Sequence, residues 1–139
     1  MSVTETIAHT AFHHPIRVYW EDTDAGGIVF YANYLKFFER ARTEWLRSLG
    51  HGQQQMVEET GRMFVVQETR VRYVQAARLD DCLDVTVQVC ARGRASLRIL
   101  QQALRGQALL AEGEIRIGCV ERASLKPARI PGIILESIA

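Results

Sequence analysis

Residues 19–50 read YWEDTDAGGIVFYANYLKFFERARTEWLRSLG, and this stretch decides most of the fold. It opens with a short acidic turn that contains two aspartates and two glycines. Apolar residues then recur at steps of three and four, a spacing that predicts one buried face of a helix over residues 32–49. Gly50 is placed to end that helix in a left-handed conformation. The apolar positions are Leu35, Phe38, Ala41, Trp45 and Leu49.

On either side of this helix the chain alternates at a period of two, which is typical of strands. We expect a first strand at residues 16–20, after a ragged lead-in over residues 1–14. A short second helix is predicted at residues 53–60, closed by Gly61. Strands are then predicted at residues 64–73, 83–89, 95–104 and 109–121, and a short helix near the C-terminus. Val65, Thr69, Val71 and Tyr73 are expected on one side of the first of these four strands.

The segregation of one long helix from a run of strands joined by tight turns predicts an α+β fold. One apolar helix face and one apolar sheet face must cover each other. A curved, mainly antiparallel β-sheet wrapped around the central helix meets that need. With 139 residues and no low-complexity linker, the chain is expected to be one domain, residues 1–139.

Composition excludes several classes of protein. The formal net charge is +1 and the basic residues are scattered, so no nucleic-acid partner is expected. The three cysteines form no CxxC pair, which argues against a disulfide scaffold or a zinc site. The first residues lack a secretory pattern and no stretch has the length of a membrane span. We therefore expect a cytoplasmic protein without a metal or cofactor.

The acidic turn allows several interpretations. A calcium loop of the EF-hand type counted from Asp22 would place Gly26 and Asn33 at ligand positions, where a glycine has no side-chain oxygen. A phosphatase with a paired-aspartate motif would need a larger domain. Aspartate and glycine are also common in purely structural turns. On the residues alone, a structural role and a catalytic role both remain open.

The catalytic interpretation depends on where the turn lies. A carboxylate held just before a helix could attack a carbonyl carbon or deprotonate a water that does so. The free N–H groups and positive dipole end of the helix would then stabilise the oxyanion. This combination favours acyl transfer, and thioester hydrolysis in particular.

The motif closely resembles the signature of hotdog-fold acyl-CoA thioesterases. The branch is the one related to 4-hydroxybenzoyl-CoA thioesterase, and the resemblance is strongest to the thioesterases associated with the Tol-Pal system. The resemblance extends over residues 14–138. Beyond the motif, the similar segments are FVV at 64–66, YVQAARLDDCLDV at 73–85, RGRASL at 92–97 and LKPARIP at 125–131. The resemblance implies a hotdog fold, a homodimer that assembles into a tetramer, and an acyl-CoA substrate carrying a small or fatty acyl group.

The resemblance also assigns roles to residues. It implies that Asp24 is the catalytic carboxylate, acting as nucleophile or general base, and that the backbone N–H of Tyr31 is the oxyanion donor. Asp22 and Gly26 are expected to hold the turn. Substrate-binding positions are assigned to Gly27, Asn33, Arg92, Arg94 and Ser96. Asn33 is interpreted as a helix N-cap, a substrate contact, or both.

Two departures from the family pattern bear on mechanism. The Tol-Pal branch commonly has histidine at the position of Tyr31, and the 4-hydroxybenzoyl branch has proline at the position of Ala25. A phenol is a poor base near neutral pH, so only the backbone role carries over to Tyr31. Two alternative functions stay open: a non-catalytic scaffold of the same fold that binds acyl-CoA or acyl carrier protein, and a hydratase or dehydratase. The latter would need a histidine within the motif.

Overall fold

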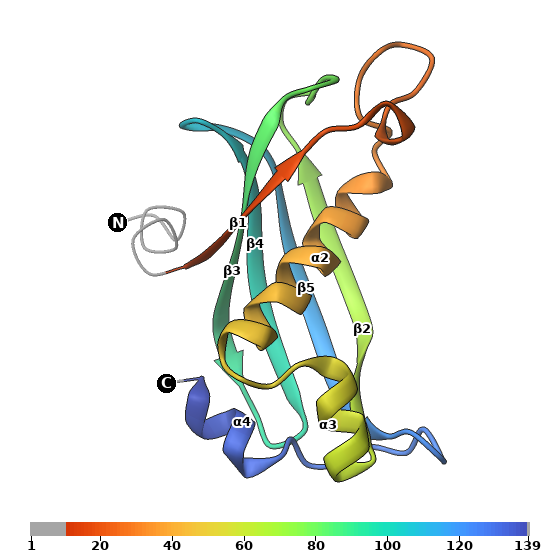
Figure 1. Cartoon of the computed structure of the whole chain (residues 1–139), viewed down its shortest axis with the longest axis vertical. Helices are drawn as coiled ribbons and strands as arrows, with labels where there is room; N and C mark the ends of the chain where they lie inside the picture. Colours follow the sequence, from red (N-terminus) through yellow and green to blue (C-terminus); the bar gives the residue numbers. More distant parts are fainter. Residues whose placement is uncertain (1–10, 139) are drawn as a thin grey trace.

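The computed structural model describes residues 11–138, which form one curved sheet and four helical segments (Figure 1). The predicted lead-in at residues 1–10 lies outside the described residues. The elements follow in chain order: β1 (Phe12–Arg17), the 3-10 turn η1 (Trp20–Asp22), α2 (Asn33–Ser48), α3 (Gln53–Thr60), β2 (Arg62–Tyr73), β3 (Cys82–Arg92), β4 (Ser96–Arg105), β5 (Ala108–Glu121) and α4 (Gly132–Ser137).

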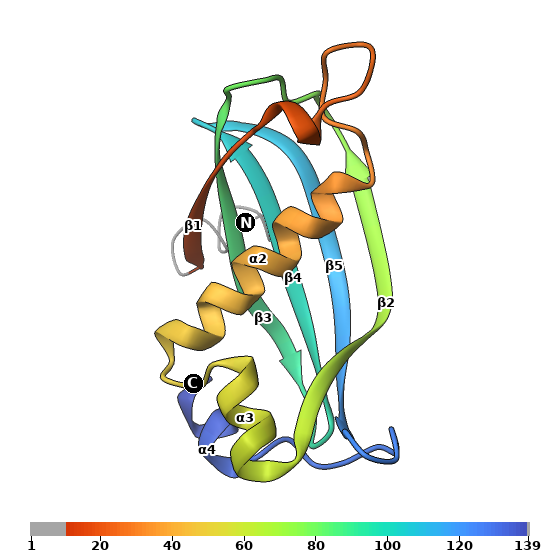
Figure 2. The ribbon, with the colours of Figure 1, turned by 45° about the vertical axis from the view of Figure 1, so that its right-hand side comes forward.

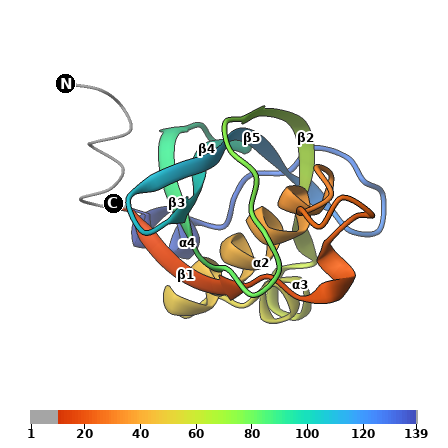
Figure 3. The same ribbon diagram turned by 90° about the horizontal axis from the view of Figure 1, so that it is seen from above.

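The five strands lie in the order β1-β3-β4-β5-β2, and every neighbouring pair is antiparallel. The sheet curls around α2, which crosses its concave face (Figures 2 and 3). The predicted α+β fold, with a long helix held in a bent antiparallel sheet, is confirmed. Among the described helices, none combines the length and the apolar character needed to cross a bilayer.

The packing of α2 on the sheet depends on one glycine. Phe37, Phe38 and Ala41 of α2 are fully buried, but Leu35, which was predicted on the buried face, is 44% exposed, so that prediction is wrong. A Cβ atom on Gly113 of β5 would lie 2.8 Å from Cε2 of Phe38 and 3.2 Å from Cδ1 of Ile115. The missing side chain therefore makes the space in which the phenyl ring meets the sheet.

A fully buried amide links the same helix to two strands. Nε2 of Gln101 donates to the carbonyl oxygens of Phe38 (3.0 Å) and Thr86 (3.2 Å). Its Oε1 accepts a hydrogen bond from the guanidinium of Arg42 at 2.9 Å. Burial lowers the pKa of Arg42, and the nearby charge of Glu39 opposes this effect only in part. Since buried polar groups need partners, this network fixes α2 against β3 and β4.

Strand β1 begins earlier than predicted. It spans Phe12–Arg17 and pairs with β3, whereas the sequence pattern placed a strand at residues 16–20. Residues 12–14 therefore belong to the sheet and not to a lead-in. Trp20 lies in η1 instead, where the local hydrogen bonds of the acidic turn bend the chain.

Strand β2 is an edge strand and contains a bulge between Val66 and Glu68. Before the bulge Val65 pairs with Gly118, while after it Thr69 pairs with Ile115. Those two β5 residues point to opposite sheet faces, so the prediction that Val65 shares a side with Thr69 is wrong. A bulge inserts one residue and inverts the alternation, a change that the sequence pattern alone does not reveal.

Candidate active site

The acidic turn folds as a small hairpin between η1 and α2. The N–H of Asp24 donates to the Ile28 carbonyl at 2.8 Å, and the N–H of Gly27 donates to the Asp24 carbonyl at 3.0 Å. Gly27 has φ +79°, as expected for the last residue of a three-residue hairpin loop. Nothing lies within 4 Å of a Cβ built on Gly27, so backbone conformation, and not close approach, requires this glycine.

The Asp24 carboxylate is oriented by the same hairpin. Its Oδ1 accepts a hydrogen bond from the N–H of Gly26 at 2.8 Å. A Cβ on Gly26 would lie only 3.2 Å from that oxygen, which explains why a second glycine is present. In the single chain Asp24 is nonetheless exposed to solvent.

Asp22 is the buried acid of the pair. Its Oδ2 accepts the N–H of Tyr19 at 2.8 Å. Its backbone carbonyl accepts the N–H of Phe30 at 3.0 Å and Nδ2 of Asn33 at 2.9 Å. These three contacts connect the 3-10 turn, the end of the hairpin and the start of α2, so the hairpin is held at the N-terminus of the helix.

The start of α2 differs by one residue from the prediction. Ala32 occupies the N-cap position and Asn33 is the first helical residue, so the N-cap interpretation of Asn33 is wrong. The Asn33 amide instead donates across the turn to Asp22. Within residues 11–138, the backbone N–H of Tyr31 donates to no acceptor. This donor is the kind that an oxyanion uses at a helix N-terminus.

A hollow of about 240 Å³ lies beside this helix start. Tyrosine rings form much of its wall: the centroids of Tyr31 and Tyr73 are 6.0 Å apart, and those of Tyr34 and Tyr73 are 5.6 Å apart. Tyr73 was predicted only as a strand residue, and its place in this wall was not. The lining residues are Ile28, Val29, Tyr31, Tyr34, Tyr73, Val74, Gln75 and Ala76.

The loop from β2 to β3 holds the hairpin from the other side. The N–H of Val29 donates to the Ala77 carbonyl at 2.9 Å. Farther along, Asp81 accepts the N–H of Arg78 (2.9 Å) and the guanidinium of Arg105 (2.8 Å). Desolvation opposes ionisation of Asp81, but these two donors prevail and hold its pKa below the ordinary value. Arg105 is thus a structural residue of the site that the sequence pattern did not reveal.

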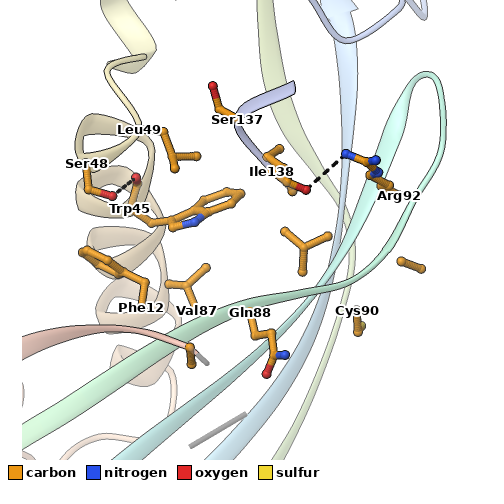
Figure 4. Close-up of a pocket in the computed structure, with 13 residues that line it drawn as sticks. Phe12, Trp45, Ser48, Leu49, Val87, Gln88, Cys90, Arg92, Ser137 and Ile138 are labelled. Atoms are coloured by element: carbon orange, nitrogen blue, oxygen red, sulfur yellow. Dashed lines mark hydrogen bonds between the residues drawn. The ribbon is translucent and has the colours of Figure 1, made fainter. Parts of the chain in front are cut away.

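The other predicted substrate-binding residues lie at the opposite end of the molecule (Figure 1). Arg92, Arg94 and Ser96 flank the β3–β4 turn, beside α4 (Figure 1). The guanidinium of Arg92 donates to the carbonyl of Ile138 at 3.1 Å (Figure 4). It also donates to the carbonyl of Leu135 at 2.8 Å. It thereby satisfies carbonyls at the C-terminal end of α4, and it borders a separate hollow of about 570 Å³ next to Trp45. One protomer does not bring these residues to Asp24.

Arg94 lies in a third hollow, of about 430 Å³, together with Arg62 and Arg129. Arg62 is held by Glu121 (3.3 Å) and by the carbonyl of Arg129 (2.9 Å). The three arginines come from distant parts of the sequence, so no local pattern marks them as a group. Together they form a basic surface that could hold phosphates.

A bent sheet around a helix, with a carboxylate-bearing hairpin at the helix start, defines the hotdog class of thioester-cleaving enzymes. The chain belongs to the thioesterase-like superfamily, whose family model matches residues 18–138. The predicted fold, family and thioesterase class are therefore confirmed.

Relatives support the assignment. The chain is 43% identical over 120 residues to the acyl-CoA thioesterase YbgC of Haemophilus influenzae, covering 86% of this chain and 88% of the relative. It is similar to a probable thioesterase from Bartonella henselae, with TM-score 0.84, 29% identity and coverage of 88% and 100%. A mutant 4-hydroxybenzoyl CoA thioesterase complexed with 4-hydroxybenzoyl CoA has TM-score 0.87, 19% identity and coverage of 93% and 99%, which shows a shared fold.

Proposed function

We propose that this chain hydrolyses the thioester bond of acyl-CoA, with Asp24 as the catalytic carboxylate and the Tyr31 N–H as oxyanion donor. One observation carries the proposal: a carboxylate fixed by Gly26 lies on a hairpin that leads into a helix whose Tyr31 N–H has no acceptor within residues 11–138. The small volume of the neighbouring hollow, about 240 Å³, favours a small acyl group.

Two mechanisms fit this arrangement. In the first, an Asp24 oxygen attacks the thioester carbon, the C–S bond breaks, and CoA leaves as a thiolate that takes up a proton. Water then opens the mixed anhydride and restores the carboxylate. In the second, Asp24 removes a proton from water as that water attacks. A single turnover in ¹⁸O-water tests the first mechanism, because label enters Asp24 only if an anhydride forms and water opens it at the Asp24 carbonyl carbon.

Exposure of Asp24 is explained if the working form is a homodimer. Strand β2 ends the sheet with a free edge, and its Val66 and Tyr73 remain 53% and 45% exposed. Antiparallel pairing of two β2 edges would continue the sheet and cover such a strand. It would also bring Arg62 of the partner subunit, at the start of its β2, close to Tyr73 at the end of this one. Two such dimers would form the tetramer.

In that dimer the basic hollow of one subunit would lie at the end of the molecule that holds the other subunit's Asp24. We assign the CoA phosphates to Arg94, supported by Arg62 and Arg129, with Ser96 near the same turn. Because such contacts are screened by salt, Arg94→Ala should raise KM and weaken its dependence on ionic strength. An unchanged salt dependence would remove Arg94 from the binding site.

The remaining assignments belong to the same proposal. We infer a cytoplasmic, single-domain enzyme that needs no cofactor beyond the CoA of its substrate. Acyl carrier protein and the Tol-Pal system are its proposed partner and cellular context. Gly27 and Asn33 would contribute to substrate binding through the hairpin and helix start that they shape.

Replacing Asp24 by asparagine tests the catalytic assignment. We expect CoA release to fall by about a hundredfold or more, because a carboxylate is lost from the reacting centre. Glu21→Gln is the matched control, since it removes a neighbouring exposed acid and should leave turnover unchanged. Thiol release followed across acyl-CoA substrates gives the rates, and thermal unfolding checks that both variants fold. Normal turnover by Asp24→Asn would refute the assignment.

The exposure of Asp24 in one protomer favours one alternative, a scaffold that binds acyl-CoA or acyl carrier protein without cleaving it. That function requires the hollows but not the carboxylate. Tight binding of acyl-CoA together with no thiol release by the unaltered protein would establish the alternative and exclude hydrolysis.

A further inference from the structure

The hollow beside the helix start contains one buried donor that the proposed mechanism does not use. Tyr34 is only 3% exposed, and its ring forms part of the wall. Its phenolic oxygen accepts the N–H of Ala77 at 3.2 Å. Within residues 11–138 its own O–H donates to no acceptor. A phenol both donates and accepts, so half of its hydrogen-bonding capacity remains available.

The position of the phenol end follows from its partner. Ala77 directly follows Ala76, which lines the hollow together with Tyr34. The hydroxyl is therefore hydrogen-bonded to the chain directly after Ala76, a residue of the same wall. Burial raises the pKa of Tyr34, so the group keeps its proton and remains a donor at neutral pH.

The other two phenols of the hollow are in a different situation. Tyr31 is 62% exposed and Tyr73 is 45% exposed, so water can satisfy their hydroxyl groups. When an acyl group fills the hollow, water next to Tyr34 must leave. A hydrocarbon group would then leave a buried donor without an acceptor, which is unfavourable, whereas an oxygen on the acyl group would restore the hydrogen bond.

We propose that the Tyr34 hydroxyl donates a hydrogen bond to an oxygen carried by the acyl group, and so selects hydroxyl- or keto-bearing acyl groups over hydrocarbon groups of the same size. This inference rests on the proposed acyl-CoA hydrolysis and adds a substrate class to it. Tyr34 is a specificity residue here, distinct from Asp24 and from the Tyr31 N–H.

Matched substrate pairs test this role. We would compare kcat/KM for butanoyl-CoA against β-hydroxybutanoyl-CoA, and for benzoyl-CoA against para-hydroxybenzoyl-CoA. In at least one pair the unaltered protein should prefer the oxygen-bearing substrate by about tenfold, the value of one neutral hydrogen bond. Tyr34→Phe should reduce that ratio to within about twofold, mainly by slowing the oxygen-bearing substrate. Tyr73→Phe is the control and should keep the ratio.

The ratio separates specificity from structure. Loss of the Ala77 contact in Tyr34→Phe would slow both members of a pair alike and leave the ratio unchanged, which would overturn the inference. An unaltered protein without any preference in either pair would overturn it before a variant is made, even if Tyr34→Phe failed to fold. No thiol release from any of the four substrates would refute the proposed hydrolysis itself, whereas hydrolysis without preference refutes only the role of Tyr34.

Discussion

Replacing Gly113 by alanine should weaken the attachment of α2 to the sheet. The new methyl group would lie 2.8 Å from Cε2 and 3.2 Å from Cδ2 of Phe38, and 3.2 Å from Cδ1 of Ile115. Carbon atoms prefer about 3.5–4.0 Å, so a fully buried ring would have to move by several tenths of an ångström. Overpacking of this kind costs about 1–3 kcal/mol, offset by about 0.5–1 kcal/mol for removing a strand glycine.

We therefore expect a net loss of about 1–2 kcal/mol in the free energy of unfolding, measured by urea titration, and a Tm lower by about 3–8 °C. Gly132→Ala is the matched control, because nothing lies within 4 Å of its Cβ and it is the first residue of α4. That control should be neutral or slightly stabilising. Phe38→Leu should partly relieve Gly113→Ala in the double variant. A Gly113→Ala protein as stable as the parent would show that Phe38 does not rest on this glycine.

Further predictions concern the hairpin and the Asp81–Arg105 ion pair in the β2–β3 loop beside it. Gly27→Ala, which forces a side chain into φ +79°, should reduce the free energy of unfolding by about 1 kcal/mol in urea titrations. Gly26→Ala should displace the Asp24 carboxylate. Expressed as free energies, the loss in kcat should exceed the loss in the free energy of unfolding, and equal losses would contradict this prediction. The pKa of Asp81 is lower in the folded chain than its ordinary value of 3.8. The contribution of ionised Asp81 to the free energy of unfolding is therefore complete above pH 3.8 and is lost as the pH falls through the lower, folded-state pKa. Stability of Arg105→Ala should therefore fall less than that of the parent between about pH 5 and pH 2, as unfolding at each pH would show.

Local patterns in the sequence were sufficient for the middle of α2 and for the glycines that follow α2 and α3, but not for the start of α2. The spacing of Phe38, Ala41 and Trp45 predicted the buried face of α2, and Gly50 and Gly61 do adopt positive φ where the two helices end. These features depend on neighbours within a few residues, which a pattern captures. The order of helix and strands likewise implied the wrapped sheet.

Features that depend on distant residues were not predictable in this way. The bulge in β2 inverts the side of Val65 because of its pairing with β5, which no period-two pattern records. Arg62, Arg94 and Arg129 meet only after the sheet has formed. The hairpin was recognised from Asp24 and its glycines, but the exposure of Asp24 follows from the folded chain and from no local pattern.

The buried Gln101 amide has a consequence for how precisely the helix can sit. An apolar contact tolerates sliding, since one methyl group can replace another with little loss. An amide that must meet Phe38, Thr86 and Arg42 at once is satisfied at a single axial position of α2. A shift of α2 by one turn would leave the charged Arg42 and the polar Gln101 without hydrogen-bond partners in the apolar interior. The network therefore fixes the axial position of α2 on the sheet. It thereby also fixes how far the N-terminus of α2 extends along the sheet.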